Sequence, residues 1–344
     1  GNIAIGRYAM DDTDTNAQTG TIAIGHSALT ALTSGIENTA IGYNAGLALT
    51  TSRSNTILGY SAMHRATTAS DYNTAIGAHA LNGSFTTADV NFCVAVGYAT
   101  LQGILTSAAS GAVAVGYASL ANNTSGTGNA ALGYQSGGNL TTGSRNLAIG
   151  HNALYQADVC NDSIAIGFEA LGGTDTGTVN KNIAIGNYAL DANLVHSTNN
   201  IAIGYNSLTN ATGNTAIYNT FCGDESGKTV SSGGYNTGFG AGVFGENGTA
   251  LTGSNNTGVG ALAGYNLEGD ALDSTFMGYK SGFAVTTGRH NTLYGKESGL
   301  SLTTGWNSVM IGYGTGDATV DSHKHTLVGN GAGGNAERII LGVV

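Results

Sequence analysis

A short pattern of polar and apolar residues recurs along the whole chain. Residues 38–42 show it clearly, because Asn, Thr, Ala, Ile and Gly follow one another there. Close copies occur at residues 73–77, 182–186 and 200–204. The residue before the glycine is apolar in every copy, and the residue three before it is usually Ile, Val or Thr. Side chains alternate between the two faces of a strand, so the pattern predicts a short strand whose first and third residues share one face.

The glycine that closes each copy sets the period of the repeat. Its positions are Gly6, Gly25, Gly42, Gly59, Gly77, Gly97, Gly116, Gly133, Gly150, Gly167, Gly186, Gly204, Gly223, Gly240, Gly260, Gly278, Gly295, Gly312, Gly329 and Gly342. Successive glycines lie 17 to 20 residues apart at every step except the last. Self-similarity at a fixed period is the signature of a repeat architecture, so we interpret the chain as about 20 copies of one unit.

Each copy also contains two turn signals. The closing glycine, called the anchor glycine below, lacks a Cβ and so permits a sharp turn or the close approach of another backbone. The Asn four residues before it is expected to tolerate left-handed backbone and to cap a turn. A second signal, Thr-Thr-Gly or a variant, occurs midway through the copy, as at residues 141–143 and 303–305. One copy is therefore interpreted as strand, turn, short strand and turn, which is one coil of a β-solenoid.

A single coil of this kind cannot be stable alone. It buries two or three apolar side chains, each contributing about 1.5–3 kcal/mol, whereas ordering its backbone costs more. Coils must therefore stack on one another, as in other repeat proteins. The density of glycine and β-branched residues and the lack of a 3.6-residue period exclude helical repeats. We predict an all-β fold, a parallel β-solenoid of the β-roll or β-helix kind, with about 20 coils of 17–20 residues.

Two kinds of coil divide the chain, although we expect one continuous rod. Residues 1–216 form coils of the Ala-Ile-Gly type, in which the residue two before the anchor glycine is Ala except at Ile57. Residues 217–344 continue the solenoid but more often place Phe, Leu or Met at that position. The two parts therefore differ in how they fill the interior, and not in their period.

A second change accompanies the larger residues. The residue four after the anchor glycine is usually Leu or Met in the first part of the chain. This residue is Gly in coils where the residue two before the anchor glycine is large, as in Phe221 with Gly227 and Phe276 with Gly282. Packed interiors tolerate exchanges that conserve volume. We therefore expect these two positions to be in contact within a coil.

The amino-acid composition excludes several classes of function. Only 9% of the residues are charged, 56 are Gly, none is Pro, and the formal net charge is −10. Nucleic acid is bound through Lys and Arg, and the 11 basic residues are scattered, so we expect no nucleic-acid partner. No apolar run approaches the roughly 20 residues of a membrane span. No catalytic triad, paired carboxylates or cofactor motif stands out, so we expect neither an enzyme nor a cofactor.

The three cysteines, Cys93, Cys160 and Cys222, are an odd and widely spaced set. Their spacing fits neither a metal site nor a redox motif. Cys222 occupies a position that holds Ile, Val or Leu in other copies, which predicts a buried apolar role. Disulfides are therefore not expected to hold the fold together.

The Asn-Thr-Ala-Ile-Gly core of the repeat resembles that of trimeric autotransporter adhesin heads, and it is equally similar to glycine-rich repeats of bacteriophage tail fibres. The present copies are longer than those of adhesin heads. Both resemblances imply a homotrimer at a virion or an extracellular cell surface. They imply a rigid spacer and host-attachment element, whose partners are copies of itself, other fibre or baseplate proteins, and cell-surface glycans. An adhesin, an extracellular polymeric filament and an ice-binding solenoid remain alternatives to a tail fibre.

Aromatic residues often follow the anchor glycine. Tyr occupies this position at Tyr43, Tyr60, Tyr98, Tyr117, Tyr134, Tyr205, Tyr279 and Tyr313. His26, His151 and Phe168 occupy it in other copies. Stacked coils would align these rings into an aromatic ladder. Such a ladder is either a carbohydrate-binding stripe or a structural stack at a subunit interface, where Tyr is also favoured.

His323 and His325 flank Lys324. On a strand, both imidazole rings would point the same way. In a homotrimer, three such pairs would offer six imidazoles to one metal ion. This arrangement predicts a metal site at His323 and His325. The alternative is a solvent-exposed pair, because His325 occupies the position of the repeat's Asn at a coil edge.

Overall fold

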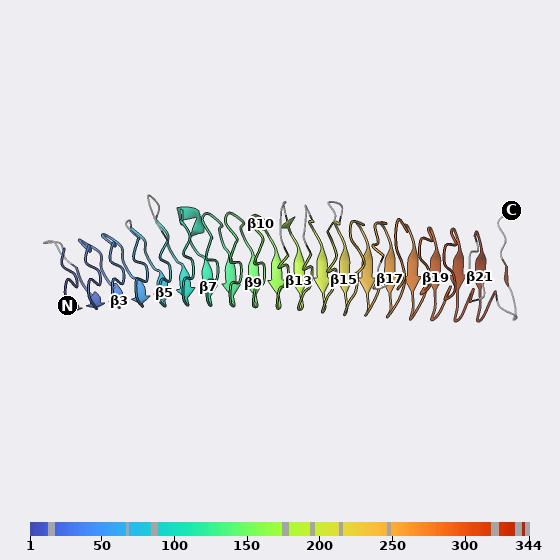
Figure 1. Cartoon of the computed structure of the whole chain (residues 1–344), viewed down its shortest axis with the longest axis horizontal. Coiled ribbons are helices and arrows are strands. Elements are labelled where there is room, and N and C mark those ends of the chain that lie inside the picture. The colour runs from blue at the N-terminus through green and yellow to red at the C-terminus, as the bar shows by residue number, and fades with distance from the viewer. Residues whose placement is uncertain are drawn as a thin grey trace. The chain divides into compact units, whose positions relative to one another are not determined.

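The computed structural model is an all-β parallel β-solenoid (Figure 1). It describes residues 1–12, 18–66, 69–83, 89–173, 179–192, 197–212, 216–245, 249–317, 323–333 and 339–340. Within these residues the one helical segment is the three-residue turn η1 (Ser107–Ala109). The chain divides into two compact units, Gly1–Glu169 and Ala170–Val344. The predicted fold class, all-β and parallel, is confirmed.

The first unit contains short strands that pair in chain order. They are β1 (Ile3–Ile5), β2 (Ile22–Ile24), β3 (Thr39–Ile41), β4 (Thr56–Leu58), β5 (Thr74–Ile76), β6 (Val94–Val96), β7 (Val113–Val115), β8 (Ala130–Leu132), β9 (Leu147–Ile149), β10 (Cys160–Asn161) and β11 (Ile164–Ile166). Except for β10, each strand pairs in parallel with the next one, without any shift in register. Ala40 of β3, for example, lies beside Ile57 of β4.

The second unit repeats this arrangement. Its strands are β12 (Val179–Asn180), β13 (Ile183–Ile185), β14 (Ile201–Ile203), β15 (Thr220–Cys222), β16 (Thr237–Phe239), β17 (Thr257–Val259), β18 (Thr275–Met277), β19 (Thr292–Tyr294), β20 (Val309–Ile311), β21 (Thr326–Val328) and β22 (Ile339–Ile340). Strands β13 to β21 form a parallel ladder in register. Strand β22 pairs with β21 in the antiparallel sense.

The anchor glycines form a vertical file in each unit. A Cβ built on Gly42 would lie 2.5 Å from the carbonyl oxygen of Gly59, and one built on Gly59 would lie 2.6 Å from that of Gly77. The backbone at Gly42 also has φ of 138°, a conformation that L side chains rarely adopt. Both reasons proposed for the glycine, a sharp turn and a close approach, are confirmed.

Apart from β1, which is exposed throughout, the three-residue strands bury only their central residue. Ala23, Ala40 and Ala75 are fully buried, whereas the residues on either side of each of them are partly exposed. The alternation predicted from the sequence is therefore confirmed. The apolar residue before each anchor glycine, such as Ile41, lies on the outer face of the strand and does not belong to the core.

Left-handed backbone recurs at fixed positions of the coil. Residues two and four after the anchor glycine have positive φ, as in Ser27 (φ 55°) and the buried Leu29 (φ 52°). The residue before the repeat's Asn has it too, as in Glu37 (φ 59°). The Asn itself does not, so the prediction of a left-handed Asn is wrong. The left-handed residue of this turn is the one before the Asn, and the Asn side chain instead makes bonds inside the stack.

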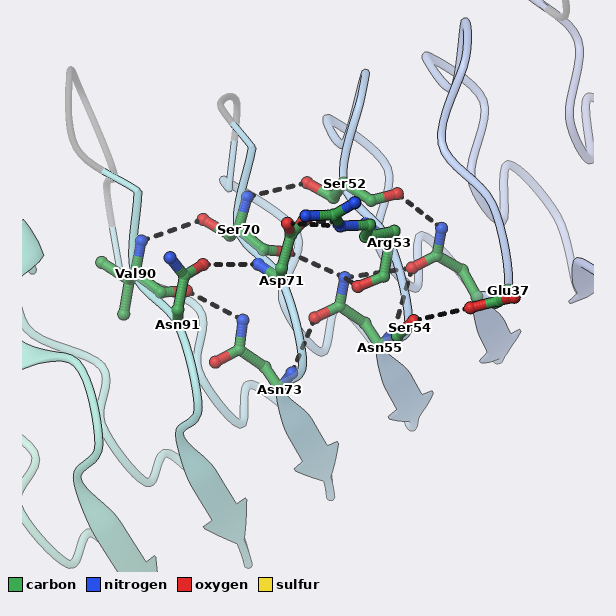
Figure 2. Close-up of polar contacts among 11 residues, drawn as sticks. Glu37, Ser52, Arg53, Ser54, Asn55, Ser70, Asp71, Asn73, Val90 and Asn91 are labelled. Atoms are coloured by element: carbon green, nitrogen blue, oxygen red, sulfur yellow. Dashed lines mark hydrogen bonds and ion pairs between the residues drawn. The ribbon is translucent and has the colours of Figure 1, made fainter.

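Buried asparagines link neighbouring coils wherever the repeat's Asn is present. Asn55 Nδ2 donates a hydrogen bond to the carbonyl of Ser70 at 2.8 Å, and Asn55 Oδ1 accepts one from the backbone N–H of Asn73 at 2.9 Å (Figure 2). Asn73 repeats both bonds one coil further on, to the carbonyl of Val90 and from the N–H of Cys93. In the second unit the same N–H bonds run along Asn182, Asn200, Asn219, Asn236 and Asn256. These side chains satisfy backbone groups that burial would otherwise leave unpaired.

The expected contact between the two compensating core positions is also confirmed. A Cβ on Gly227 would lie 2.6 Å from Cγ of Phe221, and one on Gly299 would lie 2.7 Å from Cδ1 of Leu293. The large side chain therefore fills the space that the glycine leaves open.

Compensation also crosses between coils. A Cβ on Gly46 would lie 2.8 Å from Leu29 of the preceding coil and 3.0 Å from Ile57 of the following coil. Ala40 and Gly46, a pair of small residues in one coil, are thus explained by the larger residues above and below them. Volume is conserved along the stack as well as within each coil.

Candidate functional site

An aromatic ladder runs along the first unit, with one ring from each coil. Its rings, in chain order, are Tyr8, His26, Tyr43, Tyr60, His79, Tyr98, Tyr117, Tyr134, His151 and Phe168. Tyr43 and Tyr60 stack with ring centroids 5.4 Å apart and planes 9° apart. Tyr117 and Tyr134 stack at 4.9 Å. The alignment expected of the tyrosines in this unit is confirmed.

Two members of the ladder were missed in the sequence because they occupy a different position. Tyr8 and His79 lie two residues after their anchor glycines. The position directly after the glycine, which holds the aromatic residue in the other coils, is Arg7 or Ala78 here. Their rings meet His26 and Tyr60 edge-on, at 89° and 79°. An aromatic residue one place late, in a coil without one at the usual place, is the signal that identifies them.

Aromatic residues at this position of the repeat also make ring contacts in the second unit. Tyr205 meets the ring of Tyr188 edge-on at 6.1 Å. Tyr279 and Tyr313 are exposed, and a lysine side chain lies over each ring. Lys280 Nζ is 5.4 Å from the ring centroid of Tyr279, and Lys296 Nζ is 5.2 Å from that of Tyr313. The predicted tyrosines of this unit thus include one that pairs with another ring and two that pair with lysine.

Stacking limits what the ladder can bind. Tyr117 has a parallel ring on each face, from Tyr98 and Tyr134. Such a ring presents only its edge and hydroxyl to solvent, whereas a sugar would stack on an aromatic face. Aromatic pairs contribute about 0.5–1.5 kcal/mol each beyond the area that they bury. The geometry therefore favours a structural role for the ladder in the first unit.

The outer face of the strands presents a second surface feature. The third residue of each strand forms a file of apolar side chains in register, called the outer strip below. It comprises Ile5, Ile24, Ile41, Leu58, Ile76, Val96, Val115, Leu132, Ile149 and Ile166 in the first unit. Leu132 is 50% exposed, and Phe239 at the same position in the second unit is 47% exposed. An ordered apolar strip of this kind is typical of an interaction surface.

The two histidines proposed for a metal site do not lie on a strand. Strand β21 begins after them, at Thr326, and Lys324 between them has left-handed backbone with φ of 61°. The expected strand geometry is therefore wrong. The His323 ring stacks on Trp306 with centroids 4.9 Å apart, and His325 donates its backbone N–H to Ser308 Oγ at 3.4 Å. Among the described residues, no group of three or more His, Cys, Asp and Glu side chains could hold a metal ion.

The three cysteines have different environments. Cys93 and Cys160 are buried, whereas Cys222 is half-buried. The prediction of a buried Cys222 is wrong, because it is the third residue of β15 and that position lies on the outer strip. Burial raises the pKa of the Cys93 thiol. None of these three cysteines forms a disulfide.

Comparisons with known proteins identify no family for this chain. No protein-family model matches it, and no curated protein matches it by sequence. In the part of the chain that the structure describes, no helix is long and apolar enough to cross a membrane.

Proposed function

We propose that this protein is a structural fibre protein of a phage tail, or of a similar extended surface appendage. It acts as a rigid spacer with about 20 coils and contributes to attachment at a host surface. Three copies associate, and the assembly belongs to a virion or an extracellular surface. The resemblance of the repeat supports this role, and the anchor-glycine file and the asparagine bonds support the rigidity.

The outer strip is the observation on which the proposed association of three copies rests. Apolar side chains such as Leu58, Leu132 and Phe239 are exposed on the single chain and lie in register along each ladder. Their burial against other copies would contribute about 25 cal/mol for each Å² removed from water. A closed symmetric assembly covers such a strip on every chain, which an isolated chain cannot do.

The size of the side chains on the outer strip bears on the alternatives. In the second unit the strip contains Phe239, Met277 and Tyr294, which differ in shape and size. An ice-binding solenoid needs a flat, regular face, so this surface suits a protein interface better. Two observations would separate the other candidates. Phage tail genes beside the gene for this protein would favour a phage fibre, whereas a membrane anchor at the C-terminus of the full protein would favour an adhesin.

Sedimentation equilibrium of the purified chain tests the proposal. We expect a mass three times that of the chain, which is 34.4 kDa. Leu132→Glu places a charge on the outer strip and should shift the equilibrium toward monomer by about tenfold or more, since 1.4 kcal/mol corresponds to tenfold. Thr142→Glu, at an exposed turn position outside the strip, is the matched control and should leave the mass unchanged.

Two results would contradict the proposal. One is a parent chain that sediments as a monomer at micromolar concentration. The other is a Leu132→Glu variant that associates as tightly as the parent, which would show that the outer strip is not the interface. Circular dichroism of both variants checks that the solenoid itself is intact.

A further inference from the structure

A pocket lies on the surface of the second unit beside the one tryptophan of the chain. Its volume is about 560 Å³, which falls in the range of small-molecule sites, roughly 300–1,000 Å³. The lining residues are Asp270, Thr287, Arg289, His290, Thr304, Trp306 and Asn307. They come from consecutive coils, so stacking of the coils brings the pocket together.

Trp306 differs from the rings of the aromatic ladder. His323 of the following coil stacks on the indole, and Lys324 Nζ lies 5.2 Å from the ring centroid. Neither of these two residues lines the pocket, whereas Trp306 does. The residue as a whole is 37% exposed. It therefore has support from the following coil and contributes an aromatic surface to the pocket, which the doubly stacked tyrosines cannot do.

Two backbone bonds hold Trp306 in place. Its N–H donates to Nδ1 of His323 at 3.3 Å, and its carbonyl accepts the N–H of Lys324 at 2.9 Å. These bonds fix the backbone of Trp306, and the stacked His323 ring restrains the indole, so the platform loses little conformational freedom when a ligand binds.

The charged groups of the pocket largely compensate one another. Arg289 Nη2 donates a hydrogen bond to Oδ2 of Asp270, and this contact lowers the pKa of the Asp270 carboxyl. His290 Nε2 lies 3.4 Å from Oδ2 of Asp273. A carboxylate paired with a guanidinium offers both acceptors and donors without a large net charge. This favours a neutral, polyhydroxylated ligand over a phosphate or a cation.

We propose that this pocket binds a neutral pyranose unit of a glycan. The apolar face of the sugar ring lies on Trp306, and its hydroxyl groups exchange hydrogen bonds with Asp270, Arg289 and Asn307. Thr287 and Thr304 also line the pocket. The site deepens the attachment role proposed above and depends on that role only for the biological source of the glycan.

Trp306 is the chain's one tryptophan, so its fluorescence reports on this pocket without a label. The full chain is titrated with methyl glycosides of neutral hexoses, 6-deoxyhexoses and N-acetylhexosamines, and with short oligosaccharides that contain them. We expect a saturable change in emission for at least one of these sugars. Inorganic phosphate serves as the anion probe and should cause no change.

Variants separate the pocket from the rest of the surface. Trp306→Ala and Asp270→Ala should each weaken binding of the responding sugar, measured by calorimetry, by about tenfold or more, which corresponds to 1.4 kcal/mol. Arg145→Ala is the matched control, because it removes an exposed ion pair with Asp162 between coils of the first unit. That variant should bind as the parent does.

Three results would overturn the assignment. They are no emission change with any sugar of the panel, an equal response to phosphate, and parental affinity in a folded Trp306→Ala variant. The titration does not depend on association of the chain. A monomeric parent that still shows the emission change would contradict the trimeric fibre alone, whereas a trimer without the change would contradict the glycan site alone.

Discussion

At the scale of single residues, the fold depends on conformations that most side chains avoid. The anchor glycine is required twice, by its backbone angle and by the carbonyl oxygen of the next coil. Elsewhere the coil accepts strain, as at the buried Leu29, whose φ is 52°. Such a residue costs of order 1–3 kcal/mol, which only the surrounding packing can offset. Glycine at the equivalent position, as in Gly46, removes that strain and gives its space to neighbouring coils.

Gly42→Ala tests the anchor position. The new Cβ would meet Gly59 backbone atoms at 2.5–2.8 Å and would need φ near 138°. We expect the free energy of unfolding to fall by about 2–4 kcal/mol from strain and overpacking together, measured by urea denaturation followed by circular dichroism. Gly314→Asn is the control, because Gly314 has φ of 58° and nothing within 4 Å of the added Cβ. A Gly42→Ala variant that loses no more stability than Gly314→Asn would contradict the requirement for glycine at the anchor position.

At the scale of the coil, the sequence was informative about periodicity and volume. The glycine period, the strand positions and the pairing of large with small core residues were all visible in it. The role of the repeat's Asn was not, because Asn is common both in left-handed turns and in buried hydrogen-bonded positions. Only the stacked coils show that Asn55 meets the backbone of Ser70 and Asn73.

A double-mutant cycle tests the volume compensation. Gly282→Leu alone should destabilise the protein, because the Phe276 ring already fills the space beside Gly282. Adding Phe276→Ala recreates the small-then-large arrangement of the Ala-Ile-Gly coils and should recover part of the stability. We expect a coupling energy of about 1–3 kcal/mol between the two positions, from denaturation of the four proteins. Additive effects would mean that the two side chains do not share one space.

At the scale of the whole molecule, the surface was harder to predict than the interior. The apolar residue before each anchor glycine suggested a core position, as for Cys222, yet it lies on the outer strip. An apolar residue in the pattern predicts only that the side chain is buried away from water. Packing against another copy of the chain achieves this as well as burial in the core does. The Trp306 pocket was equally hidden, because Asp270, Arg289 and Asn307 occupy different positions in their coils and only stacking brings them together.

The cysteines provide a readout of the proposed assembly. In the native protein, Cys93 and Cys160 should resist iodoacetamide, because both are buried and burial also raises the pKa of the Cys93 thiol. Cys222 should react about tenfold more slowly in the parent trimer than in the Leu132→Glu variant. Peptide mapping by mass spectrometry gives the three rates separately. Equal Cys222 rates in trimer and monomer would show that its strand face stays open to solvent.

The unshifted register of the strands has a consequence for how such a chain can change its length. Removing residues 134–150 would join Gly133 to His151 and delete one whole 17-residue coil of the first unit. The glycine, asparagine and aromatic files would each lose one member and close again, since every coil contacts only its neighbours. The stack would shorten by one strand spacing, about 4.8 Å. Duplication or loss of single coils therefore offers a graded way to adjust reach without redesigning the fold.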